Sequence, residues 1–135
     1  MRRLSLLLLA VGLVVSACGG AASAPAGTVD LVTPAAAADV ITDAPAGLVV
    51  LDIRTPDEFN AGALPNAINI DFYAPDFGDR LAALDKDVPY VMYCNSGNRS
   101  AAAAGQMEDL GFAQVYEIDG GIQAWARAGG PLALP

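Results

Sequence analysis

The stretch from Cys94 to Arg99, "CNSGNR", has the residue types of an anion-binding loop. An alanine-rich run follows it and predicts a helix over residues 99–110. The first N–H groups of a helix have no partner within it, and the aligned peptide dipoles stabilise negative charge there. Gly97 can adopt backbone angles that turn successive N–H groups inward. A cysteine at the mouth of such a loop should have its thiolate favoured over its thiol, so Cys94 is a candidate nucleophile.

The elements that must position this loop follow from hydrophobic pattern and capping signals. Thr33 and Pro34 predict a helix start, and Thr55 with Glu58 has the spacing of a capping box. Strands are expected at residues 48–53, 67–70, 90–93 and 114–118, and helices from 34 onward and at 56–62, 79–84, 99–110 and 122–128. Strands that alternate with helices predict an α/β fold, with a small parallel β-sheet of about five strands and helices on both faces. Such sheets bind ligands at the carboxyl ends of their strands, where the loop after Tyr93 would lie.

The small number of cysteines and the absence of histidine restrict the kinds of catalytic and metal site that the chain can form. The chain has two cysteines, Cys18 and Cys94, and no histidine. The absence of histidine excludes Ser-His-Asp and Cys-His catalysis and leaves no imidazole for a zinc site, so we expect no metal.

The N-terminal region resembles a bacterial lipoprotein signal. Residues 1–17 comprise a basic start, the apolar run 6–15 and small residues, and the apolar run is too short for a membrane-spanning helix. "VVSAC" resembles a lipobox, which implies that Cys18 becomes a lipidated N-terminus. We therefore expect a signal peptide at 1–17, a flexible tether at 18–28 and one domain at 29–135. The expected location is the extracytoplasmic face of a cell-envelope membrane, in the periplasm or outside the cell, with the protein held by its lipid.

Charge argues against nucleic acid as a partner. After removal of residues 1–17, five Lys and Arg remain against fifteen Asp and Glu, a net charge of −10. A phosphate backbone would be repelled, and no basic patch is evident.

Three ordered blocks give the chain a resemblance to the rhodanese family of sulfurtransferases. They are "LDIRTPDEFNAGALPNAINI", "YCNSGNRSA" and "GFAQVYEIDGGIQAW". The resemblance implies that Cys94 takes a sulfane sulfur from thiosulfate, a persulfide or a polysulfide and passes it to cyanide or a thiol. It further implies that the amides of Asn95, Ser96, Gly97, Asn98 and Arg99 cradle the persulfide, that Arg99 supports the loop and adds positive potential, and that no cofactor takes part. We expect a monomer.

For several other side chains we expect a structural role rather than a catalytic or binding one. Asp52 and Arg54 occupy positions that the family uses around its site, and a structural ion pair is the simpler role for them. We expect Trp125 and Tyr116 in the core and Glu108 and Asp109 on a solvated helix face.

Two departures from the family bear on the substrate. Many relatives have histidine where Ala63 stands, and relatives specialised for thiosulfate often have a basic residue where Asn95 stands. With one nearby cation and strong net negative charge, we expect weak thiosulfate turnover, with a high KM that falls as salt rises.

Two alternative functions remain open. One is a catalytically weak or silent rhodanese module that binds a partner or senses redox state. The other is a small-anion reductase or phosphatase. It is disfavoured because the four residues between Cys94 and Arg99 make a smaller ring than those enzymes use.

Overall fold

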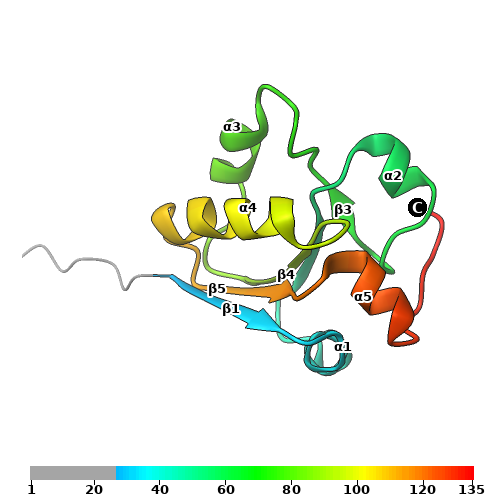
Figure 1. Ribbon diagram of the computed structural model, residues 1–135. Helices are drawn as coiled ribbons and strands as arrows, with labels where there is room; N and C mark the ends of the chain where they lie inside the picture. Colours follow the sequence, from blue (N-terminus) through cyan, green and yellow to red (C-terminus); the bar gives the residue numbers. More distant parts are fainter. Residues whose placement is uncertain (1–26) are drawn as a thin grey trace, which may run out of the picture.

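The computed structural model describes residues 27–135, which form a five-stranded parallel sheet with helices on both faces (Figure 1). The strands lie in the order β1-β5-β4-β2-β3. Their bounds are β1 Thr28–Val32, β2 Val49–Asp52, β3 Ile68–Asn69, β4 Pro89–Tyr93 and β5 Gln114–Ile118. The predicted fold class is confirmed.

The buried positions of the three inner strands are mostly apolar, as expected for strands that helices cover on both faces. In β4 every residue from Tyr90 to Tyr93 is buried, and β4 pairs with β2 on one side and β5 on the other. The segment that leaves β4 therefore emerges at the middle of the sheet's carboxyl edge.

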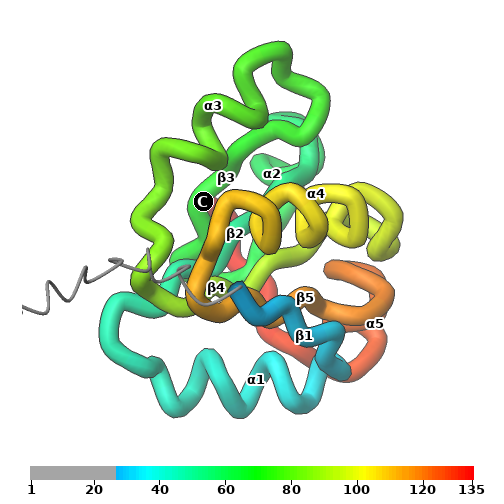
Figure 2. Tube along the Cα trace, turned by 90° about the vertical axis from the view of Figure 1, so that its left-hand side faces the viewer, coloured from blue at the N-terminus to red at the C-terminus, as the bar shows by residue number. Residues whose placement is uncertain are grey.

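Two helices lie on each face of the sheet, as the views in Figures 1 and 2 show. On one face, α1 (Pro34–Asp43) and α5 (Gly121–Arg127) pack through Ala37, Ile122 and Trp125. On the other, α3 (Phe77–Ala82) and α4 (Asn98–Asp109) pack through Phe77, Leu81, Ala103 and Met107. The short helix α2 (Pro56–Asn60) follows β2 at the carboxyl edge. Trp125 is buried and Tyr116 is half-buried against the α1 side of the core, whereas Glu108 and Asp109 are exposed, as predicted.

The capping signals in the sequence mark real helix starts. The Thr33 hydroxyl accepts from the N–H of Ala36, and Thr55 with Glu58 forms the predicted capping box at the start of α2. Pro occupies the first turn of both helices, where its missing N–H costs nothing.

Two features differ from the sequence-based expectation. Helix α3 begins at Phe77 rather than at Asp79, because the buried Phe77 ring anchors its first turn in the core. Strand β1 was not predicted, and its first residue, Thr28, belongs to the segment expected to be tether. None of its residues is fully buried: Val29 and Val32 pack partly on the two core clusters, and Leu31 is exposed. It forms by pairing with β5.

The predicted signal peptide, Cys18 and most of the predicted tether lie outside the described residues. Among residues 27–135, no helix is long and apolar enough to cross a membrane.

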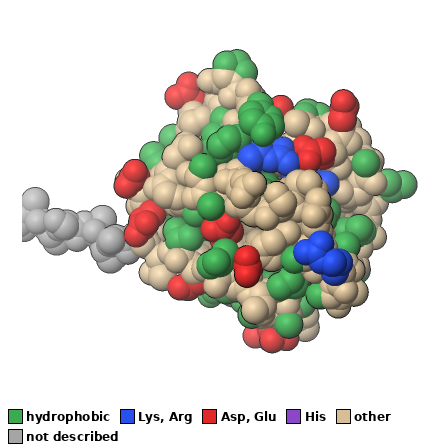
Figure 3. Space-filling model, in the orientation of Figure 1, with side chains coloured by type: hydrophobic (Ala, Val, Ile, Leu, Met, Phe, Trp, Pro, Cys, Tyr) green, Lys and Arg blue, Asp and Glu red, His purple; other side chains and the backbone are tan. Residues whose placement is uncertain are grey.

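Acidic side chains outnumber basic ones in this part of the chain, which holds all fifteen Asp and Glu and five of the seven Lys and Arg. Figure 3 shows one face, on which acidic side chains are scattered and basic side chains form a few small groups, one of them next to acidic side chains. The described surface is therefore anionic overall.

Candidate active site

The loop from Cys94 to Gly97 connects the central strand β4 to the first turn of α4. Gly97 is the N-cap of α4 and has a φ of 104°, a left-handed backbone conformation that residues other than glycine rarely adopt. This backbone turn directs amide hydrogens back toward the start of the loop.

The sulfur of Cys94 lies at the focus of this turn. Cys94 is only 1% exposed, and the N–H of Gly97 donates a hydrogen bond of 3.1 Å to its Sγ. Burial by itself would raise the pKa of the thiol. The hydroxyl and N–H of Ser100, together with the N–H groups of Gly97 and Ser96, outweigh burial and lower the pKa below the ordinary value. The site therefore favours a thiolate.

Helix α5 supports the loop from the opposite side. The N–H groups of Ile122 and Gln123 donate to the carbonyls of Cys94 (2.9 Å) and Asn95 (3.2 Å). Gly121 lies so close to the Cys94 carbonyl that a Cβ there would overlap it. The Gly120–Gly121 turn is thus a structural part of the site.

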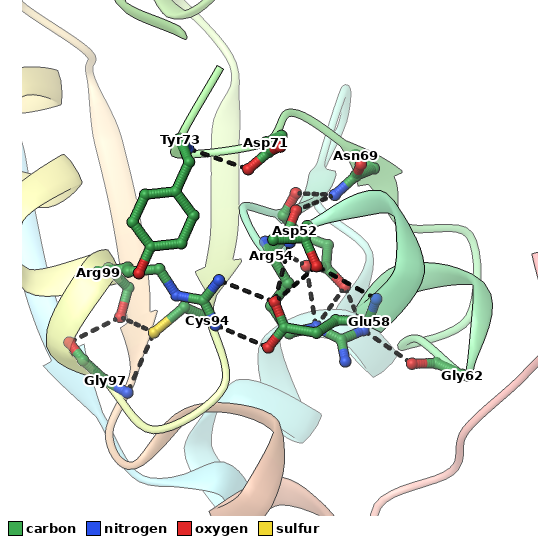
Figure 4. A network of polar contacts seen from close by, with 12 residues as sticks. Asp52, Arg54, Glu58, Gly62, Asn69, Asp71, Tyr73, Cys94, Gly97 and Arg99 are labelled. Carbon is green, nitrogen blue, oxygen red and sulfur yellow. Dashed lines mark hydrogen bonds and ion pairs between the residues drawn. The ribbon is translucent and has the colours of Figure 1, made fainter. Parts of the chain in front are cut away.

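Arg99 points away from open solvent and is paired with Glu58. Its Nη1 and Nη2 donate to the two carboxylate oxygens of Glu58 at 2.9 and 2.8 Å, a bidentate geometry (Figure 4). Glu58 also accepts from the N–H and hydroxyl of Thr55. The exposed ring of Tyr73 lies 5.4 Å from the guanidinium carbon of Arg99. Arg99 therefore ties the loop to α2, and its charge is compensated.

The Arg99–Glu58 pair predicts a specific acid sensitivity. Hydrogen bonds from Arg99, opposed by burial and helped by Thr55, lower the pKa of Glu58 from 4.5 to about 2. Because the folded value lies below the unfolded one, the pair contributes stability above pH 4.5 that is lost as pH falls toward 2. We expect Glu58→Gln to be less stable near neutrality and to lose less stability over this acid range. Urea unfolding at several pH values checks this.

The matched control for that experiment is Glu108→Gln, which removes an exposed carboxylate. Its stability should follow the wild-type pH profile. If Glu58→Gln and wild type lose the same stability between pH 4.5 and 2, the pair does not act as described.

Asp52 and Arg54 form a second, fully buried ion pair beside the site. Nη2 of Arg54 lies 2.6 Å from Oδ2 of Asp52 and donates at 2.7 Å to the carbonyl of Gly62. The guanidinium also lies 5.6 Å from the Tyr93 ring centre. Neither side chain has a hydrogen bond to Cys94 among the described contacts. Their observed role is to hold the end of β2 against the segment after α2.

The structure brings together part of the predicted set. The N–H groups of Ser96 and Gly97 face the Cys94 sulfur, and Arg99, held by Glu58, acts on it only electrostatically. The Asn95 carbonyl faces α5, and Asn98 is exposed in the first turn of α4. Ala63, at the position of the family's histidine, pairs through its backbone with Ala133 near the C-terminus.

Four contacting residues were not singled out from the sequence as site residues. Glu58 was identified only as a capping residue and Tyr73 was not noted. Ser100 lies within the block "YCNSGNRSA" but was given no role of its own. Glu117, buried in β5, was not noted either, and it accepts a hydrogen bond from the Ser100 hydroxyl. Its signal was available, since a carboxylate in an inner strand requires a partner.

Among residues 27–135, no group of three or more His, Cys, Asp or Glu side chains is arranged to hold a metal ion.

Several known sulfurtransferases and one rhodanese-related structure are similar to this chain. A "Sulfurtransferase" of Allochromatium vinosum is 36% identical over 88 residues, covering 65% of this chain and 80% of the relative. A "Thiosulfate sulfurtransferase GlpE" of Pseudomonas aeruginosa is 39% identical, covering 58% and 70%. The crystal structure of a rhodanese-related protein from Thermoplasma volcanium superposes with a TM-score of 0.69 at 32% identity, covering 78% and 99%. The family profile of the rhodanese-like domain matches residues 33–128, and the chain belongs to this family.

Proposed function

We propose that this protein is a rhodanese-type sulfurtransferase that carries a sulfane sulfur as a persulfide on Cys94. The observation that carries the proposal is the Cys94 sulfur, buried at the start of α4 with the Gly97 N–H bonded to it. The names of its sulfurtransferase relatives support the same reaction class.

The reaction needs no external acid or base at the leaving group. The Cys94 thiolate attacks the outer sulfur of the donor, an S–S bond forms, and the donor's own bond to that sulfur breaks. The electron pair leaves with the donor as sulfite or a thiolate, each stable as an anion. Cyanide or an acceptor thiolate then attacks the terminal sulfur, leaves as thiocyanate or a persulfide, and restores the Cys94 thiolate.

Mass spectrometry of the intact protein tests this function. After exposure to a sulfane donor, the protein should gain one sulfur atom, located on the peptide that contains Cys94. A thiol or cyanide should then remove it and yield the persulfide or thiocyanate. No gain with any of thiosulfate, a persulfide or a polysulfide would refute the proposal and favour a silent binding module.

For the donor, we propose a persulfide or polysulfide rather than thiosulfate. Arg99 is matched by Glu58 and Arg54 by Asp52, so these two arginines supply little net charge. The described surface is anionic, which repels a dianion at low ionic strength. Thiosulfate turnover should therefore show a high KM that falls as salt screens the repulsion.

A new cation beside the sulfur should change this preference. Asn95→Lys is expected to lower the KM for thiosulfate about tenfold at low salt, equivalent to about 1.4 kcal/mol of binding. The KM for an organic persulfide should change much less. Steady-state kinetics across a range of salt concentrations measure both.

Gln106→Lys makes the same charge change on the exposed side of α4 away from the loop and is the control. It should leave both KM values near wild type. Tight, salt-independent thiosulfate binding by the wild-type protein would contradict the donor assignment.

The alternative of a small-anion reductase or phosphatase receives no support from the loop. Four residues separate Cys94 from Arg99, and the guanidinium is held by Glu58 rather than presented to a tetrahedral anion.

We also propose that the mature protein is held on a membrane by a lipid on Cys18, on the basis of the "VVSAC" motif. Two or three acyl chains on one residue give stable anchoring. Cys18→Ala should move the protein from the membrane fraction to the soluble fraction once the signal is cleaved. Persistence in the membrane fraction after cleavage would count against lipidation.

A further inference from the structure

Glu117 is a carboxylate in a place where the sheet is otherwise apolar. It lies in β5 and is 5% exposed, and its register neighbours are Leu31 in β1 and Met92 in β4. Burying a charged group without a partner is costly, so such a residue usually has a specific contact. For Glu117 that contact is the Ser100 hydroxyl, 2.7 Å from Oε1.

Ser100 connects Glu117 to the reactive sulfur. It is fully buried in the first turns of α4, and its Oγ accepts from the Cys94 thiol at 3.5 Å. The same hydroxyl lies within donating distance of Glu117 and of the Gly97 carbonyl at 3.1 Å. A hydroxyl has one proton and can donate strongly to one acceptor at a time. When the Ser100 hydroxyl donates its hydrogen bond to Glu117, it therefore cannot also donate one to the Cys94 sulfur.

The two protonation states of this trio require opposite hydrogen-bond directions. When Cys94 is a thiol, S–H donates to Ser100, and Ser100 donates to an ionised Glu117. When Cys94 is a thiolate, the Ser100 hydroxyl must turn toward the sulfur to stabilise it. That turn is favourable only if Glu117 is protonated and donates to Ser100 in return.

We propose that Glu117 receives the Cys94 proton through Ser100 when the thiolate forms, and returns it when the thiol is restored. Glu117 does not touch the sulfur, so it is a positioning residue that acts through Ser100. The inference rests on the proposed sulfurtransferase function for its biological purpose, but the proton transfer can be measured without any sulfur donor.

The proton balance closes within the trio. The Sγ–H bond breaks as its proton passes to Ser100 Oγ, and the original Ser100 proton passes to Oε1 of Glu117. The trio bears one negative charge before and after, first on the carboxylate and then on sulfur. The thiolate then attacks the donor as described above. After discharge of the persulfide, the reverse transfer restores the thiol.

The surroundings agree with this exchange. Burial raises the pKa of Glu117, opposed by the Ser100 hydrogen bond and reinforced by Asp119, while the pKa of the Cys94 thiol is lowered. Among the described residues, Arg99 acts electrostatically on Cys94 while its guanidinium is paired with Glu58, and the exposed Asp119 acts on Glu117. From α5, the Arg127 guanidinium lies beside Gly120, which packs against Gly97. The β1 and β4 neighbours of Glu117 carry no charge. In a chain without histidine, the trio thus supplies a proton acceptor for the Cys94 thiol.

The test is the pH dependence of Cys94 alkylation by iodoacetamide in the full chain, with folding verified by circular dichroism. In Glu117→Gln the amide donates to Ser100 permanently and carries no charge, as a protonated Glu117 would. The apparent pKa of Cys94 should fall by roughly one unit, which gives about tenfold more thiolate below the wild-type pKa. Wild type should show two coupled ionisation steps and Glu117→Gln one.

Glu108→Gln is the matched control, because it makes the same change at an exposed carboxylate near the far end of α4, which has no bond to Ser100. Its alkylation profile should stay close to wild type. Ser100→Ala should instead raise the apparent pKa of Cys94, and in that background Glu117→Gln should have little further effect.

Infrared spectroscopy with labelled glutamate gives a second readout, which a purely structural role would not change. A protonated-carboxyl band should accompany the thiolate near neutral pH, disappear as higher pH removes the last proton of the trio, and be absent in Glu117→Gln. A Glu117→Gln alkylation profile identical to wild type, or a shift in the same direction as Ser100→Ala, would overturn the proposal. If the titration shows the proton transfer but the protein gains no sulfur from any donor, the proton transfer stands and the proposed sulfurtransferase function is wrong.

Discussion

We expect Cys94→Ser to take up no sulfur and to transfer none above background, a loss of at least about 10³-fold in kcat/KM. A serine hydroxyl is not ionised near neutrality, and oxygen is a far poorer nucleophile toward sulfur than a thiolate. The substitution preserves size and polarity in a buried position, where the Gly97 N–H can bond to oxygen instead of sulfur. Intact-protein mass spectrometry and a thiocyanate assay measure the two losses.

Ser96→Ala is the matched loop variant for this experiment. The Ser96 side chain is exposed and its backbone N–H is kept, so activity should remain within a few-fold of wild type. Sulfur uptake by Cys94→Ser would place the carrier elsewhere and refute the assignment of Cys94. Loss of activity in both variants would show that the loop tolerates no change and would require thermal unfolding data to separate folding from chemistry.

The largest effect on stability is expected from Asp52→Asn. Asp52 is fully buried, and its carboxylate accepts from the Arg54 N–H at 2.8 Å and from the guanidinium at 2.6 to 3.1 Å. The amide leaves the Arg54 charge buried without its counterion. Breaking one side of a buried pair typically costs about 3–5 kcal/mol, a large part of a small domain's stability. Urea unfolding measures the loss.

Asp109→Asn, an exposed carboxylate at the end of α4, is the control and should change stability by less than about 0.5 kcal/mol. A loss of less than about 1 kcal/mol in Asp52→Asn would mean that water or a side-chain rearrangement compensates Arg54. In that case the pair would not be what holds β2 to the segment after α2.

Local signals were sufficient for most of the fold. Thr33 and Thr55 mark helix starts because a cap satisfies N–H groups only two or three residues away. The buried strands β2, β4 and β5 are evident from short apolar runs between turn residues. Strand β1 is the exception, since it depends on pairing with β5 across most of the chain.

The sequence was less informative about the site. It predicted the Cys94 loop and the role of Gly97, because both follow from a strand, a turn and a helix start in succession. The supporting part for Arg99 came from the family resemblance. It expected Arg99 to add positive potential beside the sulfur, and the structure pairs that charge with Glu58, a partner that the sequence did not identify. It predicted that a structural ion pair was the simpler role of Asp52 and Arg54, and the two are bonded to each other.

What the sequence alone determined is therefore the order of elements, the parallel sheet and the cysteine at its carboxyl edge, all of which depend on interactions between near neighbours. Only the tertiary structure decided which charges meet. Glu58 and Arg99 are separated by 41 residues and Ser100 and Glu117 by 17. Such contacts depend on how helices pack on the sheet, and no local spacing encodes them. They are also the contacts that set the charge around the sulfur.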